Sequence, residues 1–521
     1  MGSWPGWPRR RRIMSELMTW RNPRQIIERV VVKGELILQT PAHFGNGDPD
    51  PWSHVDMTLL RDPLAGKALL PGASLAGALR NYLRDLEVGY AVGYPRSLTG
   101  EEPAAETRSH KKRLTEKQER ETYSVSLFGG FKGDDDGSQS LLIVDDALGE
   151  IGQLELREGV KIDPATRTAE EEKLFDMELL PAGTKFSLCF ELLIPEQQTD
   201  RLLKALALAL GGFEPGDGRA WGEITLGARK RRGFGRCKVD CWEVTRYNLT
   251  TGQGLIDWLD RDGVAEKNKS IAAALKIGSI APLDVRHSFT LEADLALDGS
   301  LLIRSGFGVD DNAPDVVQLH VTQPDGTKKP VVPGTSLAGV LRQRALRIAQ
   351  TLHGSKGAAL VNQMFGCGNE NEQDKETMTA SRVIVEDAVV TGYKSMVQSR
   401  IKIDRFTGGA YETALFEEQP IFGNKTSRLT VRLTLRNPAD PEIGLLLLVL
   451  KDLWTGDLPL GGESGIGRGR LLGQKAVLTL RQNGQSGQWT IAQAGEGLTV
   501  ESPDTLQTYV NKLHQLQEAV V

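Results

Sequence analysis

The sequence predicts an α+β protein made of two tandem domains of the ferredoxin-like arrangement. The first observation is a repeated motif, because LLPGASLAGALRNYL at residues 69–83 returns as VVPGTSLAGVLRQRA at residues 331–345. The second is an alternation, within each copy, of segments with the two-residue apolar period of a strand and segments with helical periodicity. Strand, helix, strands, helix and strand follow one another in each copy, which is the order of a ferredoxin-like domain. We therefore expect the same unit twice.

Other landmarks recur after the repeated motif and give the size of the copied unit. The prolines of the two Pro-Gly turns are 262 residues apart (333 − 71), and the segments IVDDA and IVEDA are 241 apart (387 − 146). We match the glycines of the terminal loops 240 residues apart, as Gly222 with Gly462, Gly227 with Gly467, and Gly233 with Gly473. Such spacing predicts two domains of roughly 200 residues each. The expected divisions are a basic extension at 1–25, a first domain at 26–244 with a charged, solvated insert at about 97–123, a linker at 245–285, a second domain at 286–480 and a tail at 481–521.

The strands and helices of the two copies can be placed from their apolar periods. Strict alternation predicts half-buried strands along residues 186–192, 289–297 and 429–435. Helices are expected after the Pro-Gly turns and before the glycine-rich loops, at residues 74–86, 201–210, 336–352 and 442–453. A half-buried strand leaves one face of its sheet free. Sheets of this arrangement commonly offer that face and their edge loops to single-stranded RNA.

Composition describes an ordinary globular protein of 521 residues, 40% hydrophobic and 25% charged. The longest apolar run, residues 443–450, is far shorter than the roughly 18 residues of a membrane span and is expected to be part of a buried helix. Four cysteines without a CxxC pair indicate a reducing compartment and no zinc site. Cys237 and Cys241 alternate with Val239 and are expected to be small core residues. The N-terminus lacks the apolar stretch of a signal peptide, so we expect a cytoplasmic protein without a membrane partner.

Basic residues are concentrated even though the net charge is −5. Residues 226–238, LGARKRRGFGRCK, contain six basic side chains and no acid. Glycines allow the main chain to approach a sugar-phosphate strand, and arginines neutralise it. Neither this loop nor its counterpart LGGESGIGRGRLLG is a P-loop, since no Gly-Lys-Ser/Thr follows. The loop residues expected to contact RNA are Arg229, Lys230, Arg231, Arg232, Arg468 and Arg470.

The repeated motif suits a phosphate-binding helix start. Pro-Gly makes a turn after a strand, and Ser74 or Ser336 stands where an N-cap would bond the first free amides of a helix. Those amides and the helix dipole attract phosphate, and Arg80 or Arg342 follows within reach of the same backbone. A capped structural helix whose small residues permit packing explains the same pattern. The nearby glycine loop in each copy favours phosphate binding.

Four landmarks together resemble the RAMP superfamily of CRISPR-associated proteins. They are the PGxSLAGxLR helix start, the LFG or MFG segment followed by IV(D/E)DA, the run IDRFTGGAYETALF at residues 403–416, and the terminal glycine-rich loop. All four occur in both copies, the third in degraded form in the first copy, over about residues 29–244 and 286–478. The resemblance is greatest to the backbone subunits of type III effector complexes, and two domains in one chain resemble the tandem protein of III-D-type systems. It implies subunits that line up along a guide RNA, each projecting a thumb hairpin that kinks the guide–target duplex.

The resemblance also implies metal-dependent cutting of the target RNA. In target-cleaving members an aspartate precedes the proline of the Pro-Gly turn by 15 residues, and Asp56 stands at that distance from Pro71 (71 − 56 = 15). Its carboxylate would hold Mg²⁺, or another divalent ion such as Mn²⁺, or orient a ribose 2′-hydroxyl. His43 and His54 either assist it or simply hydrogen-bond the loop.

The second copy departs from this spacing. Counting back 15 residues from the second proline gives Gln318, which cannot replace a carboxylate (333 − 318 = 15). Asp315 takes the position if the turn at residues 321–330 contains three extra residues, and Asp310 and Asp311 are rivals. We take Asp56 and Asp315 as the expected catalytic and metal-binding residues.

The expected thumb of each copy follows its ID motif. The second copy keeps the arginine and the Thr-Gly pair of the family pattern, whereas the first copy has lost them. Lys161, Lys402 and Arg405 are expected to contact RNA there. The leucine and phenylalanine at residues 174–175 and 415–416 either wedge between bases or anchor the hairpin in the core.

The function that the resemblance implies is guide-directed cleavage of RNA. The expected partners are the CRISPR guide RNA, the complementary target RNA, other RAMP-type subunits and the large signature subunit of the complex. Two alternatives remain: a scaffold that binds guide RNA without cutting, and a metal-independent endoribonuclease that processes guide precursors. Cleavage of repeat hairpins in the presence of EDTA would favour the last.

Overall fold

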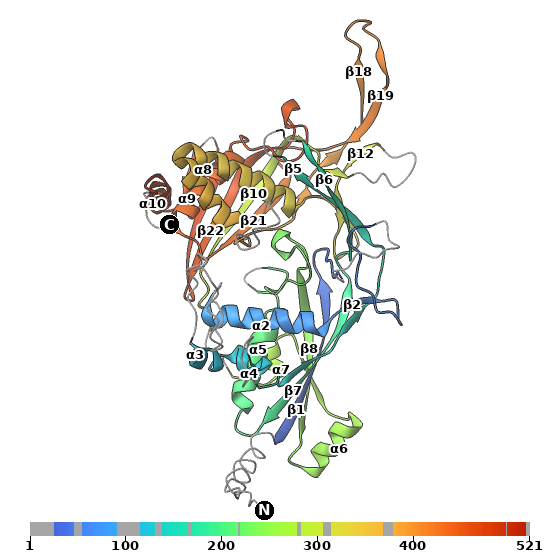
Figure 1. Cartoon of the computed structure of the whole chain (residues 1–521), viewed down its shortest axis with the longest axis vertical. Helices are drawn as coiled ribbons and strands as arrows, with labels where there is room; N and C mark the ends of the chain where they lie inside the picture. Colours follow the sequence, from blue (N-terminus) through green and yellow to red (C-terminus); the bar gives the residue numbers. More distant parts are fainter. Residues whose placement is uncertain are drawn as a thin grey trace, which may run out of the picture.

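The computed structural model describes residues 25–45, 55–90, 115–130, 138–163, 166, 168–216, 219–278, 283–305, 314–367, 379–495 and 497–516. His54, Asp310 and Asp311 lie outside these residues, as do the N-terminal extension and most of the expected insert. Figure 1 shows an elongated molecule, with the N-terminal half at one end of the long axis and the C-terminal half at the other. Both halves are mixed α/β units with antiparallel sheets, as the sequence predicts.

The first half contains a seven-stranded sheet in the order β2-β4-β7-β1-β8-β9, with β3 also paired to β7. Its strands are β1 (Ile26–Leu38), β2 (Ala68–Leu70), β3 (Leu142–Val144), β4 (Ala147–Gly149), β7 (Lys185–Pro195), β8 (Cys237–Asn248) and β9 (Ala265–Asn268). Its helices are α2 (Gly72–Val88), α3 (Glu116–Arg120), α4 (Tyr123–Phe128), α5 (Thr199–Gly211), α6 (Gly252–Asp260) and α7 (Ile271–Ala274). The core forms where one face of α2 and α5 meets the sheet, around Leu79, Leu83, Leu206, Phe190 and Trp242. The residues between the two copies contribute to this core through α7.

The second half repeats this plan in an eleven-stranded sheet. Its strands are β10 (Ser288–Leu301), β13 (His320–Thr322), β14 (Lys328–Val332), β15 (Val383–Val385), β16 (Ala388–Thr391), β17 (Lys394–Ser395), β20 (Ile421–Gly423), β21 (Arg428–Arg436), β22 (Arg470–Gln482), β23 (Gln485–Ala494) and β24 (Gly497–Val500). Its helices are α8 (Gly334–Phe365), α9 (Asp440–Trp454) and α10 (Pro503–His514). The tail extends the sheet with β23 and β24, and α10 packs on α9. The buried helix expected at residues 443–450 is α9.

Each half carries a β-hairpin of its own. In the first half, β5 (Glu155–Ile162) pairs with β6 (Ala169–Leu179). In the second half, β18 (Gln398–Ile403) pairs with β19 (Ala410–Gln419), and β19 also pairs with β12 (Val316–Gln318), which joins β11 (Arg304–Ser305). Figure 1 shows the β18–β19 hairpin projecting from the end of the molecule.

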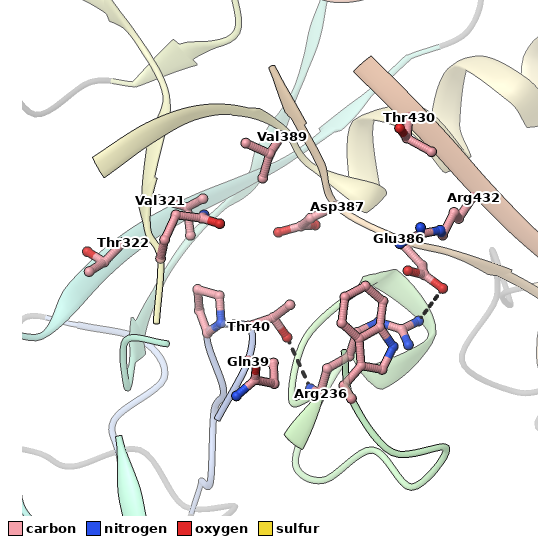
Figure 2. A pocket seen from close by; sticks show the side chains of 13 residues that line it. Gln39, Thr40, Arg236, Val321, Thr322, Glu386, Asp387, Val389, Thr430 and Arg432 are labelled. Carbon is pink, nitrogen blue, oxygen red and sulfur yellow. Dashed lines mark hydrogen bonds and ion pairs between the residues drawn. The ribbon is translucent and has the colours of Figure 1, made fainter. Parts of the chain in front are cut away.

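Buried ion pairs join the two halves. Arg236 in the first half lies 2.6 Å from Glu386 in the second, and Arg157 of β5 lies 3.0 Å from Asp387. Trp221 lies between two guanidinium groups, with Arg236 5.2 Å and Arg432 5.3 Å from its ring centroid. Figure 2 shows several of these side chains around a cavity of about 240 Å³ between the halves. Desolvated pairs of this kind hold the halves in one relative position.

The terminal glycine loops correspond with an offset of 234 residues, so the match at 240 is wrong. A 3₁₀ turn at Lys230–Arg232 ends at Gly233 (φ 94°), and one at Ser464–Ile466 ends at Gly467 (φ 89°; 467 − 233 = 234). The N–H of Leu226 donates to the carbonyl of Gly235 at 2.9 Å, and that of Leu460 donates to the carbonyl of Gly469 at 2.9 Å. Glycine-rich sequences match in more than one register, and only the hydrogen bonds decide between them.

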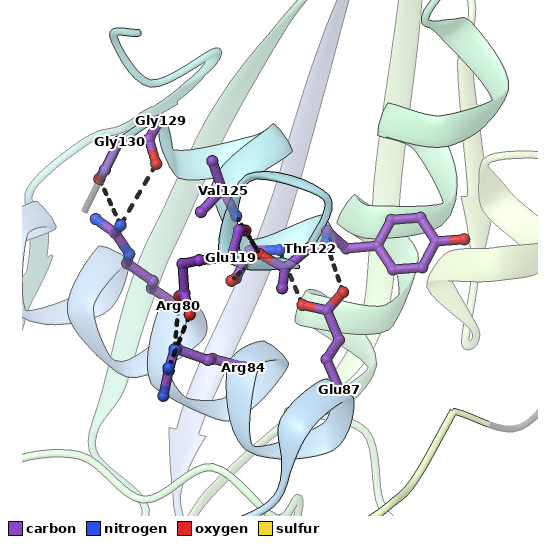
Figure 3. A network of polar contacts seen from close by, with 10 residues as sticks. Arg80, Arg84, Glu87, Glu119, Thr122, Val125, Gly129 and Gly130 are labelled. Atoms are coloured by element: carbon purple, nitrogen blue, oxygen red, sulfur yellow. Dashed lines mark hydrogen bonds and ion pairs between the residues drawn. The ribbon is translucent and has the colours of Figure 1, made fainter. Parts of the chain in front are cut away.

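One local expectation also fails. Cys237 is buried but Cys241 is exposed, because β8 has an irregular register that brings Trp242 into the core instead. The last residues of the expected insert form a mostly exposed helix, α3, which is anchored by Glu119, whose fully buried carboxylate is held by the guanidinium of Arg84 on α2 at 2.8 Å. Figure 3 shows this contact beside that of Glu87, which accepts the N–H groups of Tyr123 and Ser124.

The pairing of Asp387 predicts a difference between two matched substitutions. Asp387→Ala removes the acceptor of the Gly334 N–H and leaves Arg157 buried without its partner, so it should lower the free energy of unfolding of the second half by about 3–5 kcal/mol. Asp146→Ala removes only the equivalent bond to Gly72, at an exposed site, and should cost about 1 kcal/mol. Urea unfolding of both variants measures this, and equal losses would contradict it.

Candidate functional site

Asp56 and Asp315 occupy the same place in the two halves. One carboxylate oxygen of Asp56 accepts the backbone N–H of Asp176 on β6 at 3.0 Å. One carboxylate oxygen of Asp315 accepts the backbone N–H of Glu417 on β19 at 2.8 Å. Asp176 and Glu417 are themselves equivalent, because both follow the Leu-Phe pair of their hairpin strand (417 − 176 = 241). Both aspartates are exposed.

The strand pairing around the aspartates confirms that Asp315, rather than Gln318, corresponds to Asp56. Met57 pairs in parallel with Met177, and Val316 pairs in parallel with Glu418, with offsets of 259 (316 − 57) and 241 (418 − 177). The Pro-Gly turns are offset by 262 and this strand pairing by 259, so the second copy has three extra residues between its aspartate and its proline. Gln318 is buried, and its side-chain amide bonds Ile303 N–H and the Val331 carbonyl.

A second acid lies beside each aspartate and was missed in the sequence. Asp176 and Glu417 offer their backbone N–H to the aspartates, and the carboxylate of Glu417 accepts the hydroxyl of Ser399 at 3.1 Å. The signal was an acid directly after the Leu-Phe pair in both copies. In the described part of the chain, no group of three or more His, Cys, Asp or Glu side chains is placed to hold a metal ion. The chemistry of a single exposed carboxylate in each half is compatible with Mg²⁺, which keeps several waters and is commonly held by one or two carboxylates together with substrate phosphates.

His43 has a structural place. Its side chain is 2% exposed, and its Nδ1 lies 2.8 Å from the carbonyl of Glu178 on the strand that also bonds Asp56. The carboxylate of Glu178 accepts the N–H of Leu59 at 3.0 Å. His43 and Glu178 therefore fix the loop that carries Asp56, which agrees with the plainer of the two expectations for this histidine.

The residues that pack beneath the two hairpins differ in kind. In the first half, Met177, Leu179 and Phe234 form a small apolar cluster. In the second half, the position of Met177 holds Glu418, which is fully buried and pairs with Arg468 and Arg400 at 3.1 Å each. Arg468 also lies 2.7 Å from Glu463 and is 3% exposed. The expected RNA contact of Arg468 therefore does not fit its place inside an ion network.

The helix starts are built differently from the expectation. Pro71 and Pro333 occupy the N-cap positions, and neither Ser74 nor Ser336 caps its helix. A carboxylate serves instead, since Asp146 accepts the N–H of Gly72 at 2.7 Å and Asp387 accepts that of Gly334 at 2.7 Å.

The arginines of the repeated motif have partners within their own halves. Arg80 donates to the carbonyls of Gly129 and Gly130, as Figure 3 shows, and Arg342 donates to the side chain of Asn362 at 3.0 Å. In both halves a carboxylate already occupies the first free amide of the helix. The helix starts therefore have fewer free N–H groups for a phosphate than the sequence predicts.

The first glycine loop lies against the second half. A Cβ added to Gly334 would lie 2.5 Å from the Arg232 carbonyl, and one added to Gly233 would lie 2.5 Å from the Asp387 nitrogen. Arg232 donates to the carbonyl of Val383 at 3.4 Å. Arg229 stacks on Phe175, 4.2 Å from the ring centroid. Burial lowers the pKa of Lys230, Arg231 and Arg232. This basic cluster is thus partly an interface between the halves.

The outer part of the β18–β19 hairpin presents the basic and aromatic side chains that the sequence places there. Lys402 lies 4.8 Å from the ring centroid of Tyr411, and Arg405 is exposed. Phe406, in the turn, is 96% exposed and was missed, although it stands inside the run that carries the family resemblance. In the first half Lys161 pairs with Glu170 at 2.7 Å. Exposed aromatic side chains beside cations are the groups on which unstacked bases pack.

The fold and the site define a duplicated α/β protein in which each half carries an aspartate at the base of a hairpin. A family profile of the RAMP superfamily matches residues 35–238 and 278–471, one match in each half. The chain belongs to the RAMP superfamily, which indicates a CRISPR-associated RNA-binding protein with two tandem RAMP domains. A search among curated proteins found no match. Within the described residues, no helix is long and apolar enough to cross a membrane.

Two substitutions of Asp56 distinguish its contribution to stability, through this hydrogen bond, from any contribution of its charge to a reaction. Asp56→Asn keeps a side-chain oxygen that can accept the Asp176 N–H, so it should change the free energy of unfolding by less than about 0.5 kcal/mol. Asp56→Ala loses the bond and should cost about 1 kcal/mol. Denaturant unfolding of the two variants checks this. A large loss with Asn would show that the charge itself stabilises the hairpin.

Proposed function

We propose that this protein is a backbone subunit of a type III CRISPR effector complex, most like the tandem protein of III-D-type systems, which binds guide RNA and cuts complementary target RNA. Each RAMP domain has the connectivity strand, helix, strands, helix, strand, with β7-β1-β8 or β21-β10-β22 at the centre, and we assign it to the ferredoxin-like class. The hairpins β5–β6 and β18–β19 serve as the thumbs. Its other partners are RAMP-type subunits and the large signature subunit, in the cytoplasm.

One observation carries the proposed cleavage. Two exposed aspartates, in loops of different length, accept equivalent backbone N–H groups, those of Asp176 and Glu417, where the two hairpins leave the domains. A hairpin inserted between two neighbouring base pairs of the guide–target duplex would leave one nucleotide unstacked. That nucleotide would lie near the point where the hairpin leaves the domain, which is where the aspartate lies. The second oxygen of each carboxylate is directed at no described hydrogen-bond partner, which leaves it for a ligand.

The carboxylate can act on the ribose next to the cut. It accepts a hydrogen bond from the 2′-hydroxyl and orients its oxygen toward the adjacent phosphorus. The 2′-oxygen forms a bond to phosphorus as its proton passes to solvent, the bond from phosphorus to the 5′-oxygen breaks, and the departing 5′-oxygen takes a proton from solvent. The products are a 2′,3′-cyclic phosphate and a 5′-hydroxyl. Mg²⁺ held by Asp56 or Asp315, with Asp176 or Glu417 beside it, would neutralise charge on the phosphate.

Asparagine variants test this cleavage without losing the structural bond. In a reconstituted complex with guide and end-labelled target RNA in Mg²⁺, Asp56→Asn should lower the rate of one discrete cut at least about a hundredfold. Asp315→Asn should do the same to a different cut. Asp62→Asn is the matched control, because Asp62 is a nearby aspartate that only caps its own turn through Leu64 and Ala65.

The outcomes separate the alternatives. Loss of one cut in each variant, with target binding unchanged, supports two nuclease sites. If every cut persists in the double variant with target bound, the protein is a scaffold and the cleaving groups belong to other subunits.

Metal dependence is a separate prediction. EDTA should abolish both cuts, and Mg²⁺ or Mn²⁺ added in excess should restore them, because a divalent cation neutralises the negative charge that develops on the phosphate, which a carboxylate cannot do. The check is a titration of cleavage rate against free metal. Undiminished cleavage of repeat hairpins in EDTA would instead indicate guide processing.

Phe406 is expected to stack on a base of the bound duplex. Phe406→Ala should weaken binding of target RNA to the guide complex about tenfold, since stacking on an aromatic side chain contributes about 1–3 kcal/mol per base. Leu498→Ala, exposed on β24, is the control and should leave affinity unchanged. Filter binding or fluorescence anisotropy at fixed salt measures the effect, and equal affinities of the two variants would exclude the stacking.

A further inference from the structure

The helix α6, in the segment between the two domains, has an apolar face that is open to solvent. Leu255, Ile256 and Leu259 are 43%, 52% and 63% exposed. Their spacing of one and four residues puts them on the same side of the helix. Figure 1 shows α6 at the end of the first half that lies away from the second half. Single exposed leucines are common, but three large apolar side chains on one helix face indicate a surface that another segment binds.

Acidic residues border this apolar face. Residues 257–262, DWLDRD, contain three acids and one base, a net charge of −2. Asp260 lies one turn after Ile256, and both Asp260 and Asp262 are exposed. Among the described residues neither aspartate forms an ion pair. The guanidinium of Arg261 lies instead 5.8 Å from the ring centroid of Trp258. The surface therefore suits a segment that is both apolar and basic.

The first strand of the chain begins beside α6. The N–H of Leu249 donates to the carbonyl of Ile27 on β1 at 2.9 Å, and α6 begins three residues after that leucine. On α6 itself, the ring centroid of Trp258 lies 4.3 Å from the guanidinium of Arg29, also on β1. Residues 1–24, which lie outside the described residues, therefore join the structure next to this helix.

The sequence before β1 has the complementary character. Four of its apolar residues recur at the spacing found on α6 and would share one face of a helix: Ile13, Met14, Leu17 and Met18. Four arginines precede them, and residues 9–20 contain four bases and one acid, a net charge of +3. Helix-breaking prolines stand only outside this stretch, at residues 8 and 23.

We propose that residues 9–20 of this chain bind α6 as a short amphipathic helix. Their apolar face covers Leu255, Ile256 and Leu259, and the arginines lie beside Asp260 and Asp262. The connection is long enough, because the five residues that follow residue 20 span about 17 Å when extended, whereas the nine residues of α6 are about 14 Å long. The contact lies within one chain and needs no RNA, so it is independent of the proposed function.

Hydrogen exchange of the full chain without RNA tests the apolar contact. The pair Leu17→Asp and Met18→Asp should raise the exchange rate of the α6 amides at least about tenfold, because the helix loses its cover. The matched control is the pair Ser15→Asp and Thr19→Asp, which adds the same two charges on the opposite side of the segment and should leave exchange within about twofold of wild type.

Trypsin tests the same contact from the side of α6. Leu259→Asp should speed cleavage after Arg12 and Arg21 at least about tenfold, since the segment is released. Leu64→Asp, at a leucine that is 97% exposed elsewhere in the first half, should not. Both original side chains are exposed, so the fold should persist, and circular dichroism with thermal unfolding verifies it.

Three results would overturn the proposal. The two pairs of segment variants change the exchange of α6 equally, or Leu259→Asp is cleaved as slowly as wild type. The third is a loss of α6 protection when wild type is diluted, which would show that a second copy covers the helix. Protection that is the same at low and high protein concentration is the result expected of a contact within one chain.

Discussion

One hydrogen bond recurs at the point where helix, sheet and neighbouring domain meet, in which an aspartate carboxylate accepts the first N–H of the helix that follows the Pro-Gly turn. Asp146 and Asp387 make it in the two halves, both at 2.7 Å. Glycine is required there, because a Cβ on Gly72 would lie 2.2 Å from the Val144 carbonyl. In the second half the same carboxylate also holds Arg157 of the first hairpin. One side chain thus starts a helix, joins it to a sheet strand and fixes the neighbouring domain.

The sequence predicted the parts of the fold that depend on local pattern. Two helices before the glycine loops and both after the Pro-Gly turns lie where apolar periodicity places them, although α8 extends beyond its expected end across a break at Gly354. The sequence predictions failed where the structure depends on pairing between residues that are distant in the chain. The glycine loops match in two registers by residue type, and the hydrogen bonds of Leu226 and Leu460 select one. Cys241 fits a buried alternation until the irregular register of β8 moves Trp242 inward.

The candidate site was predictable to the same extent. Asp56 followed from a spacing, and Asp315 followed only by allowing three extra residues in the turn, a choice that the parallel pairing of Val316 with Glu418 supports. Arg468 looked like a surface cation since nothing in the sequence shows that Glu418 and Glu463 enclose it. Glu418 comes from the hairpin and Glu463 from the start of the loop, and only the fold brings them together. Exposure of a charge cannot be read from a loop that is rich in glycine.

The two halves therefore share a frame but secure their hairpins by different means. The first hairpin rests on an apolar cluster and is held from outside, by the pair between Arg157 and Asp387 of the other half. The second rests on ions of its own half, where Arg400 and Arg468 neutralise Glu418. A buried carboxylate without those arginines would be strongly destabilising, so the second hairpin needs no neighbour to fix its base. The first needs the second half, and the positions of Asp56 and Asp315 are consequently set by one connected structure rather than by two independent domains.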